Sequence, residues 1–84
     1  MKRFKIVPTK TFTKDFKRLP PETKRRVLAA LERIKQNPYQ GRKVKAVETG
    51  EWRWRVGDYR IRYDIEGEDI VLLRVRHRRE IYRI

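Results

Sequence analysis

Hydrophobic spacing predicts a short strand and then a helix at the start of the chain. The segment Arg3–Val7 is rich in apolar residues, and Pro8 ends it. Phe12, Phe16 and Leu19 recur at intervals of four and three residues, which places them on one side of a helix. Either of two threonines just before this helix can cap it, because their hydroxyls accept from free backbone N–H groups.

A second helix follows after a tight turn. Pro21 suits its first turn, and the pair Asn37-Pro38 closes it. Its apolar stripe consists of Val27, Leu28, Leu31 and Ile34. Two short helices joined in this way predict a helical hairpin.

Alternation with a period of two predicts three strands in the second half. They cover Trp52–Val56, Tyr59–Ile65 and Ile70–Arg76, with turns at Gly57-Asp58 and at Gly67. The order β-α-α-β-β-β predicts a single α+β domain over residues 1–84. We expect a small, mainly antiparallel sheet with the helical hairpin packed on one face.

The same alternation divides the strand residues between two faces of the sheet. Beneath the helices we expect Trp52, Trp54, Val56, Tyr59, Ile61, Tyr63, Ile65, Val71, Leu73 and Val75. The opposite face then collects Arg53, Arg55, Arg60, Arg62, Arg74 and Arg76. This second set is called the arginine face below. Six like charges repel one another, so stability alone gives no reason to gather them there.

Charge points to a polyanion as the partner. The chain has 84 residues, with 24 Lys and Arg against 11 Asp and Glu, and a net charge of +13. Arginine presents a planar fork that fits phosphate and also stacks on bases. RNA contacts are therefore predicted for Arg62, Arg74 and Arg76, and for Lys43 and Lys45 in a basic loop. The competing interpretation is a solvated face that charge keeps soluble.

Composition excludes several kinds of site. With no cysteine and one histidine, the chain cannot build a disulfide scaffold, a thiol nucleophile or a histidine-rich metal site. We expect no metal and no cofactor. No apolar run approaches the ~20 residues of a membrane helix, and the N-terminus lacks the apolar region of a signal peptide. A cytoplasmic protein without a membrane partner is expected.

Over nearly its whole length the chain resembles the RelE/ParE superfamily of toxins from type II toxin–antitoxin systems. The most specific part is EWRWRVGDYRIRYDIEGEDIVLLRVRHRREIYR, preceded by the hairpin TFTKDFKRLPPETKRRVLAALERI. It carries an aromatic residue, two basic residues at alternate positions, Gly-x-Tyr-Arg, an apolar strand and a C-terminal tyrosine. The resemblance implies a metal-independent mRNA endoribonuclease that acts in the ribosomal A site. It also implies a RelB-like antitoxin as partner, besides ribosome and mRNA.

The resemblance also implies the residues of the site. The alternating basic pair falls on Arg53 and Arg55, and the arginine of Gly-x-Tyr-Arg falls on Arg60. Near the C-terminus the matching residues are Arg78 and Tyr82, the second of which can stack on a base. In the RelE branch the alternating pair is lysine, which can accept a proton, whereas guanidinium stays protonated. The general base is therefore unassigned, with His77 as the remaining candidate.

Two other functions stay open at this stage. The ParE branch shares the fold but inhibits DNA gyrase and has no ribonuclease activity. A non-catalytic basic module would bind RNA without cutting it, and its binding would be sensitive to salt.

Overall fold

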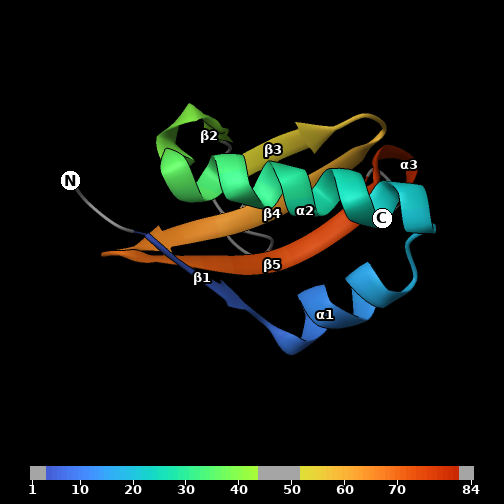
Figure 1. Ribbon diagram of the computed structural model, residues 1–84, viewed down its shortest axis with the longest axis horizontal. Coiled ribbons are helices and arrows are strands. Elements are labelled where there is room, and N and C mark those ends of the chain that lie inside the picture. Colours follow the sequence, from blue (N-terminus) through green and yellow to red (C-terminus); the bar gives the residue numbers. More distant parts are fainter. Residues whose placement is uncertain (1–3, 44–51, 82–84) are drawn as a thin grey trace.

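The computed structural model describes residues 4–43 and 52–81, which form a mixed five-stranded sheet with helices packed on it (Figure 1). The elements are β1 (Lys5–Pro8), α1 (Lys10–Lys17), α2 (Pro21–Gln36), the 3₁₀ turn η1 (Pro38–Gln40), β2 (Arg42–Lys43), β3 (Trp52–Val56), β4 (Tyr59–Glu66), β5 (Asp69–His77) and α3 (Arg78–Ile81). The strand order is β1-β5-β4-β3-β2. Only the β1–β5 pair is parallel. The predicted α+β class and its order of main elements are confirmed, with β2, η1 and α3 as additions.

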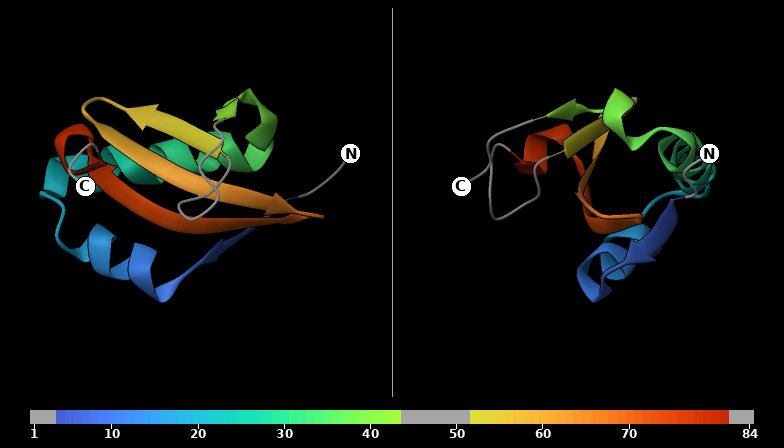
Figure 2. Two further views of the ribbon diagram at one scale, coloured as in Figure 1. Left: turned by 180° about the vertical axis from the view of Figure 1, so that it is seen from behind. Right: turned by 90° about the vertical axis from the view of Figure 1, so that its left-hand side faces the viewer.

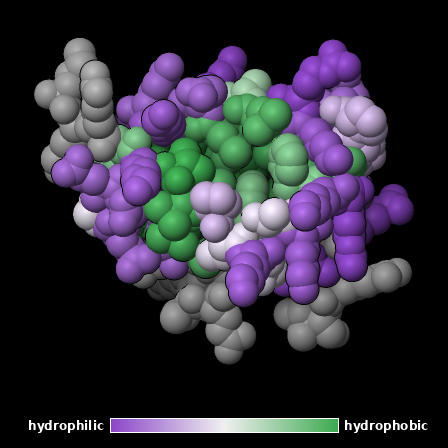
Figure 3. All heavy atoms as spheres, turned by 60° about the horizontal axis from the view of Figure 1, so that its bottom comes forward, coloured by the Kyte–Doolittle hydropathy of each residue, from purple (hydrophilic) through white to green (hydrophobic). Residues whose placement is uncertain are grey.

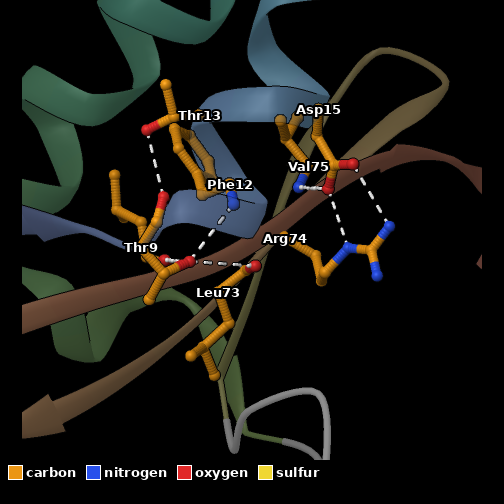
Figure 4. A network of polar contacts seen from close by, with 8 residues as sticks. Thr9, Phe12, Thr13, Asp15, Leu73, Arg74 and Val75 are labelled. Atoms are coloured by element: carbon orange, nitrogen blue, oxygen red, sulfur yellow. Dashed lines mark hydrogen bonds and ion pairs between the residues drawn. The ribbon is translucent and has the colours of Figure 1, made fainter.

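Thr9 joins the start of α1 to the centre of the sheet. Its hydroxyl accepts from the backbone N–H of Phe12 at 3.1 Å, which caps the helix. The same residue donates to the carbonyl of Leu72 in β5, from its backbone N–H at 3.0 Å and from its hydroxyl at 2.8 Å. The chain therefore leaves β1 and enters α1 while still attached to β5 (Figure 4).

Helix α2 lies across one side of the sheet and supplies much of the core. Val27 and Ile34 are fully buried against the strands. Leu31 is half-buried and packs against the same cluster. The expectation that Leu28 belongs to this stripe is wrong, because its side chain is 52% exposed. Leu28 points about 100° around the helix from Val27 and about 120° from Ile34, so it lies outside the stripe that faces the sheet.

An irregularity in β5 decides which of its residues are buried. Arg62 of β4 pairs with Arg74, but the next residue, Tyr63, pairs with Leu72, so Leu73 is an extra residue in β5. The prediction that Val71 and Leu73 lie beneath the helices is therefore wrong. Ile70, Leu72 and Val75 are the buried residues of this strand. The alternation of polar and apolar residues along the sequence does not reveal a bulge of this kind.

Tyr63 fixes the end of α2 to the sheet. Its ring is fully buried, and its hydroxyl donates to the carbonyl of Pro38 at 2.6 Å. Burial raises the pKa of this phenol well above its ordinary value. A Cβ at Gly41 would collide with the same hydroxyl, so glycine is required at that close approach.

The predicted aromatic residues of β3 and β4 lie on the core side. Trp52 stacks on Tyr63 with ring centroids 6.4 Å apart, and Trp54 and Tyr59 are half-buried against the same cluster. Figure 2 shows α2 on this side of the curved sheet and α3 near the other side, at one end of the strands. The two sides of the sheet therefore carry different chemistry.

Two substitutions in α2 separate its buried side from its exposed side. Ile34→Ala removes a fully buried side chain and is expected to lower the free energy of unfolding by about 2–5 kcal/mol. Leu28→Ala shortens a side chain that is half exposed and is expected to cost less than about 1 kcal/mol. Urea unfolding followed by circular dichroism measures both. Equal losses would contradict the placement of the two residues.

Candidate nucleic-acid interface

Strand register gathers the predicted arginines on one face of the sheet. Residues directly opposite each other in an antiparallel pair point to the same side. Arg53 pairs with Arg62, which pairs with Arg74, and in the next row Arg55 pairs with Arg60, which pairs with Arg76. The arginine face is therefore confirmed as an arrangement, opposite the buried positions of the same strands.

The first row is longer than the sequence predicts. Arg42 of β2 pairs with Arg53, so it continues the row across a fourth strand. Its neighbour Lys43 pairs with Trp52 and so points to the opposite face. The sequence predicts a loop here, with Lys43 as an RNA contact, and does not single out Arg42. The two-residue strand is too short to give a period-two signal, so no pattern in the sequence could have revealed Arg42.

A shallow depression lies where these rows meet β2. Its volume is about 400 Å³. The lining consists of Gln40, Gly41, Arg42, Arg53, Trp54, Arg55 and Arg60. Four arginines thus line one open hollow, and an anionic group is the ligand that such a hollow suits.

Arg60 is held inside this cluster with part of its guanidinium enclosed. Its Nε and Nη1 atoms are buried, and within residues 4–43 and 52–81 neither has a hydrogen-bond partner. Burial of cationic N–H groups without an acceptor costs free energy. An anion bound near Arg60 would offset that cost. The neighbouring Arg62 is only 6% exposed.

Arg74 has a partner within the chain. Its Nε and Nη2 donate to the two carboxylate oxygens of Asp15 at 2.8 and 3.1 Å (Figure 4). The same carboxylate accepts from the backbone N–H of Val75 at 3.2 Å. Asp15 lies in α1, beside the part of β5 that extends beyond its pairing with β1. Arg74 therefore stabilises the docking of α1, and its predicted contact with RNA is untested.

His77 and Arg78 stand at the end of β5. His77 lies opposite Tyr59, with ring centroids 5.3 Å apart, on the side of the sheet away from the arginine face. Its Nδ1 accepts from the backbone N–H of Arg79 at 3.2 Å. Arg78 begins α3, its side chain is exposed, and its backbone N–H donates to Asp58 at 2.7 Å. The geometry gives His77 a packing and capping contact.

The remaining predicted residues differ in their accessibility. Arg55 is exposed, and its Nε donates to the carbonyl of Gly57 at 3.2 Å. Arg53 and Arg76 are half-buried. Lys45 and Tyr82 lie outside the described residues. The roles predicted for Lys45 and Tyr82 stay predictions, as do those of Arg53, Arg55 and Arg76.

A second surface feature is apolar. A groove of about 590 Å³ runs along α2 and β1, lined by Ile6, Leu28, Ala29, Leu31, Glu32 and Lys35. Figure 3 shows hydrophobic side chains gathered in a hollow that polar side chains frame. The arginine face and this groove belong to different sides of the molecule. None of the helices in residues 4–43 and 52–81 has the length and apolar character of a membrane span.

Comparison with known proteins identifies the family. Residues 6–82 match the model of the ParE toxin of type II toxin–antitoxin systems. The chain belongs to the RelE/ParE toxin superfamily. It is also 32% identical to toxin RelE3 of Methanocaldococcus jannaschii, over 93% of this chain and 94% of that protein. This RelE/ParE protein is thus a toxin of a type II toxin–antitoxin system.

Solved structures of related toxins share the fold of this RelE/ParE chain. The RelB–RelE complex of Methanococcus jannaschii matches 90% of this chain and 94% of the solved one, with a TM-score of 0.72 and 33% identity. The RelBE2 complex of Mycobacterium tuberculosis matches 89% and 98%, with a TM-score of 0.71 and 28% identity. The RelE–RelB complex of Pyrococcus horikoshii matches 93% and 97%, with a TM-score of 0.75 at 23% identity, and supports the fold alone.

Removal of the Asp15 carboxylate is expected to destabilise this toxin. Asp15→Ala leaves Arg74 and the N–H of Val75 without their acceptor, and Asp15 itself is only 13% exposed. The expected loss is about 1–3 kcal/mol in the free energy of unfolding. Glu22→Ala is the control, because the pair Glu22–Arg25 spans 3.9 Å at an exposed position and should contribute less than about 1 kcal/mol. Thermal unfolding of both variants measures the difference, and equal shifts would contradict the assigned role.

Proposed function

We propose that this toxin is a metal-independent endoribonuclease that cleaves mRNA in the ribosomal A site and so inhibits translation in the cytoplasm. The observation that carries the proposal is the arginine face, where register aligns Arg53, Arg55 and Arg60 around one open depression. Such an array suits a phosphodiester. The 32% identity to toxin RelE3 supports the RelE branch, for which the resemblance of the sequence implies this activity.

The proposed reaction uses the ribose next to the cleaved bond. The 2′-hydroxyl loses its proton as its oxygen attacks the adjacent phosphorus. The bond from phosphorus to the 5′ oxygen then breaks, and that oxygen takes up a proton. The products are a 2′,3′-cyclic phosphate and a 5′-hydroxyl. Negative charge grows on the phosphoryl oxygens during this step, and fixed guanidinium groups stabilise it.

Roles can be proposed for individual residues. Arg60, whose Nε and Nη1 lack an acceptor within the described residues, is placed against the reacting phosphate. Arg78 on α3 is a second phosphate ligand, and Tyr82 stacks on a base. Arg53 and Arg55 stabilise the negative charge of the neighbouring phosphate. None of these arginines can accept the proton of the 2′-hydroxyl.

The general base is therefore not one of these arginines. His77 points to the other side of the sheet, and its Nδ1 already accepts a hydrogen bond. We assign proton removal to the ribosome or to the RNA itself. Proton removal by the ribosome would make activity dependent on the ribosome.

Inhibition of DNA gyrase without ribonuclease activity is the second candidate function. The observation that favours it is the family model matched by residues 6–82, which describes the ParE toxin. In that case the arginine face would serve only as a basic surface.

An antitoxin is the proposed protein partner. Two solved relatives, at 28% and 33% identity, are toxin–antitoxin complexes. A net charge of +13 favours an acidic partner, and the apolar groove along α2 and β1 offers a place for the hydrophobic side of one of its helices. We propose that a RelB-like antitoxin occupies this groove.

Primer extension on mRNA in a reconstituted translation reaction tests the ribonuclease function. The wild-type toxin should produce new stops inside A-site codons. Arg60→Ala and Arg78→Ala should each lower the cleavage rate by about 10²–10³-fold, because each removes a cation from the transition state. Arg33→Ala on the exposed surface of α2 removes the same charge and should cleave normally.

Three outcomes would count against this function. Wild-type cleavage by both site variants would refute the assigned residues. Binding of RNA without any stop would indicate the non-catalytic module. Absence of stops together with inhibited supercoiling in a gyrase assay would establish the second candidate.

The antitoxin proposal has its own test. Leu28→Glu adds a negative charge at the exposed apolar wall of the groove and should weaken binding of the cognate antitoxin at least tenfold in calorimetry. Gln36→Glu adds the same charge at an exposed position at the end of the same helix, outside the lining of the groove, and should bind nearly as wild type. Equal affinities of the two variants would place the antitoxin elsewhere.

A further inference from the structure

Arg42 continues the arginine row onto β2 and lines the depression beside Arg53 and Arg55. We propose that Arg42 binds a backbone phosphate of single-stranded RNA next to the phosphate that reacts. Arg42 would be a substrate-binding residue in addition to those implied by the family motif. The inference rests on the proposed function for the identity of the substrate, and on the register for the position of the side chain.

Register gives Arg42 its direction. The backbone pairing Arg42–Arg53 and Lys43–Trp52 places the two neighbouring cations of β2 on opposite faces. Trp52 belongs to the core side, where it stacks on Tyr63. Arg42 therefore points to the arginine face, and Lys43 points away from it.

The length of the row favours a chain of phosphates over a single anion. Neighbouring strands lie about 4.8 Å apart, so Arg42 and Arg62 are separated by roughly 10 Å across the sheet. Guanidinium groups spread over that width can contact successive phosphates of one strand, each phosphate with its own cation. The depression is open to solvent on the same side, so an extended strand can enter it.

Accessibility also suits Arg42 to ligand binding. Its side chain is exposed, whereas Arg62 is 6% exposed and Arg74 is bound to Asp15. Of the first row, Arg42 and the half-buried Arg53 are thus the cations best placed to reach an incoming phosphate. Gln40, in the turn before β2, adds an amide to the rim of the depression.

Binding of a non-cleavable RNA to the full chain tests this inference without cleavage. The probe is a fluorescent single-stranded RNA octamer with 2′-O-methyl riboses, titrated at several salt concentrations. Arg42→Ala should weaken binding about tenfold, the value of a lost charge-assisted hydrogen bond. The slope of log K against log salt should fall in magnitude by about 0.7, as expected for one phosphate contact to a single strand.

Matched variants distinguish an effect of the direction of the Arg42 side chain from an effect of losing one positive charge. Lys43→Ala removes a neighbouring cation that points to the other face, and should weaken binding by less than about twofold. Arg33→Ala removes an exposed cation on α2 and should bind as wild type. Arg42→Lys keeps the charge but loses the planar fork, so its affinity should fall between those of wild type and Arg42→Ala.

Several results would overturn the inference. Equal losses in Arg42→Ala and Lys43→Ala would show that only net charge matters. A poly-glutamate peptide is the second probe. If Arg42→Ala weakens binding of this peptide as much as it weakens binding of the RNA, Arg42 would be assigned to an acidic protein partner instead of RNA. If the wild-type toxin binds the probe through Arg42 but yields no stops in the translation reaction, only the proposed cleavage fails. If it cuts mRNA and Arg42→Ala binds normally, only this inference fails.

Discussion

The register of β3, β4 and β5 is the constraint on which the rest of the structure depends. A slip of one residue would exchange the two faces and place the arginines in the core. The aligned pairs Trp54–Ile61 and Ile61–Val75 prevent this, because they keep an apolar position in each strand on the same side. The extra residue Leu73 lets Leu72 reach the core while Arg74 stays on the arginine face. One bulge thus reconciles a continuous core with a continuous cationic face.

Repulsion within the arginine face sets the second requirement of the fold. Like charges on adjacent strands destabilise a sheet, and the rows contain several such neighbours. Asp15 relieves part of this repulsion at the β5 edge by binding Arg74. The same carboxylate occupies the N–H of Val75, so the electrostatic contact also fastens α1. At the β2 edge, arginines line an open depression. An anionic ligand bound there would offset the repulsion among these arginines most.

The limits of sequence prediction follow from these contacts. Local patterns were enough to predict two helices and four of the five strands, and they assigned all six predicted arginines to the correct face. It failed at Val71 and Leu73, because alternation cannot reveal a bulge that pairing across β4 creates. It missed Arg42, whose strand is two residues long. It could not foresee that Asp15 binds Arg74, since 59 residues separate them and only the path of α1 along β5 brings them together.

The residues of the arginine face constrain the proposed mechanism most at the step of proton transfer. Guanidinium groups stabilise a phosphoryl transition state without giving or taking protons, so the arginines supply electrostatics and orientation alone. The one histidine is engaged beside Tyr59 on the opposite side. An RNA held by arginines alone would be bound and aligned yet slow to react. Under the proposed mechanism, the ribosome completes the site by presenting the codon with its 2′-hydroxyl in line and by providing a route for the proton. Ribosome dependence then follows because none of the described residues that line the depression can accept a proton, and not because RNA binds weakly.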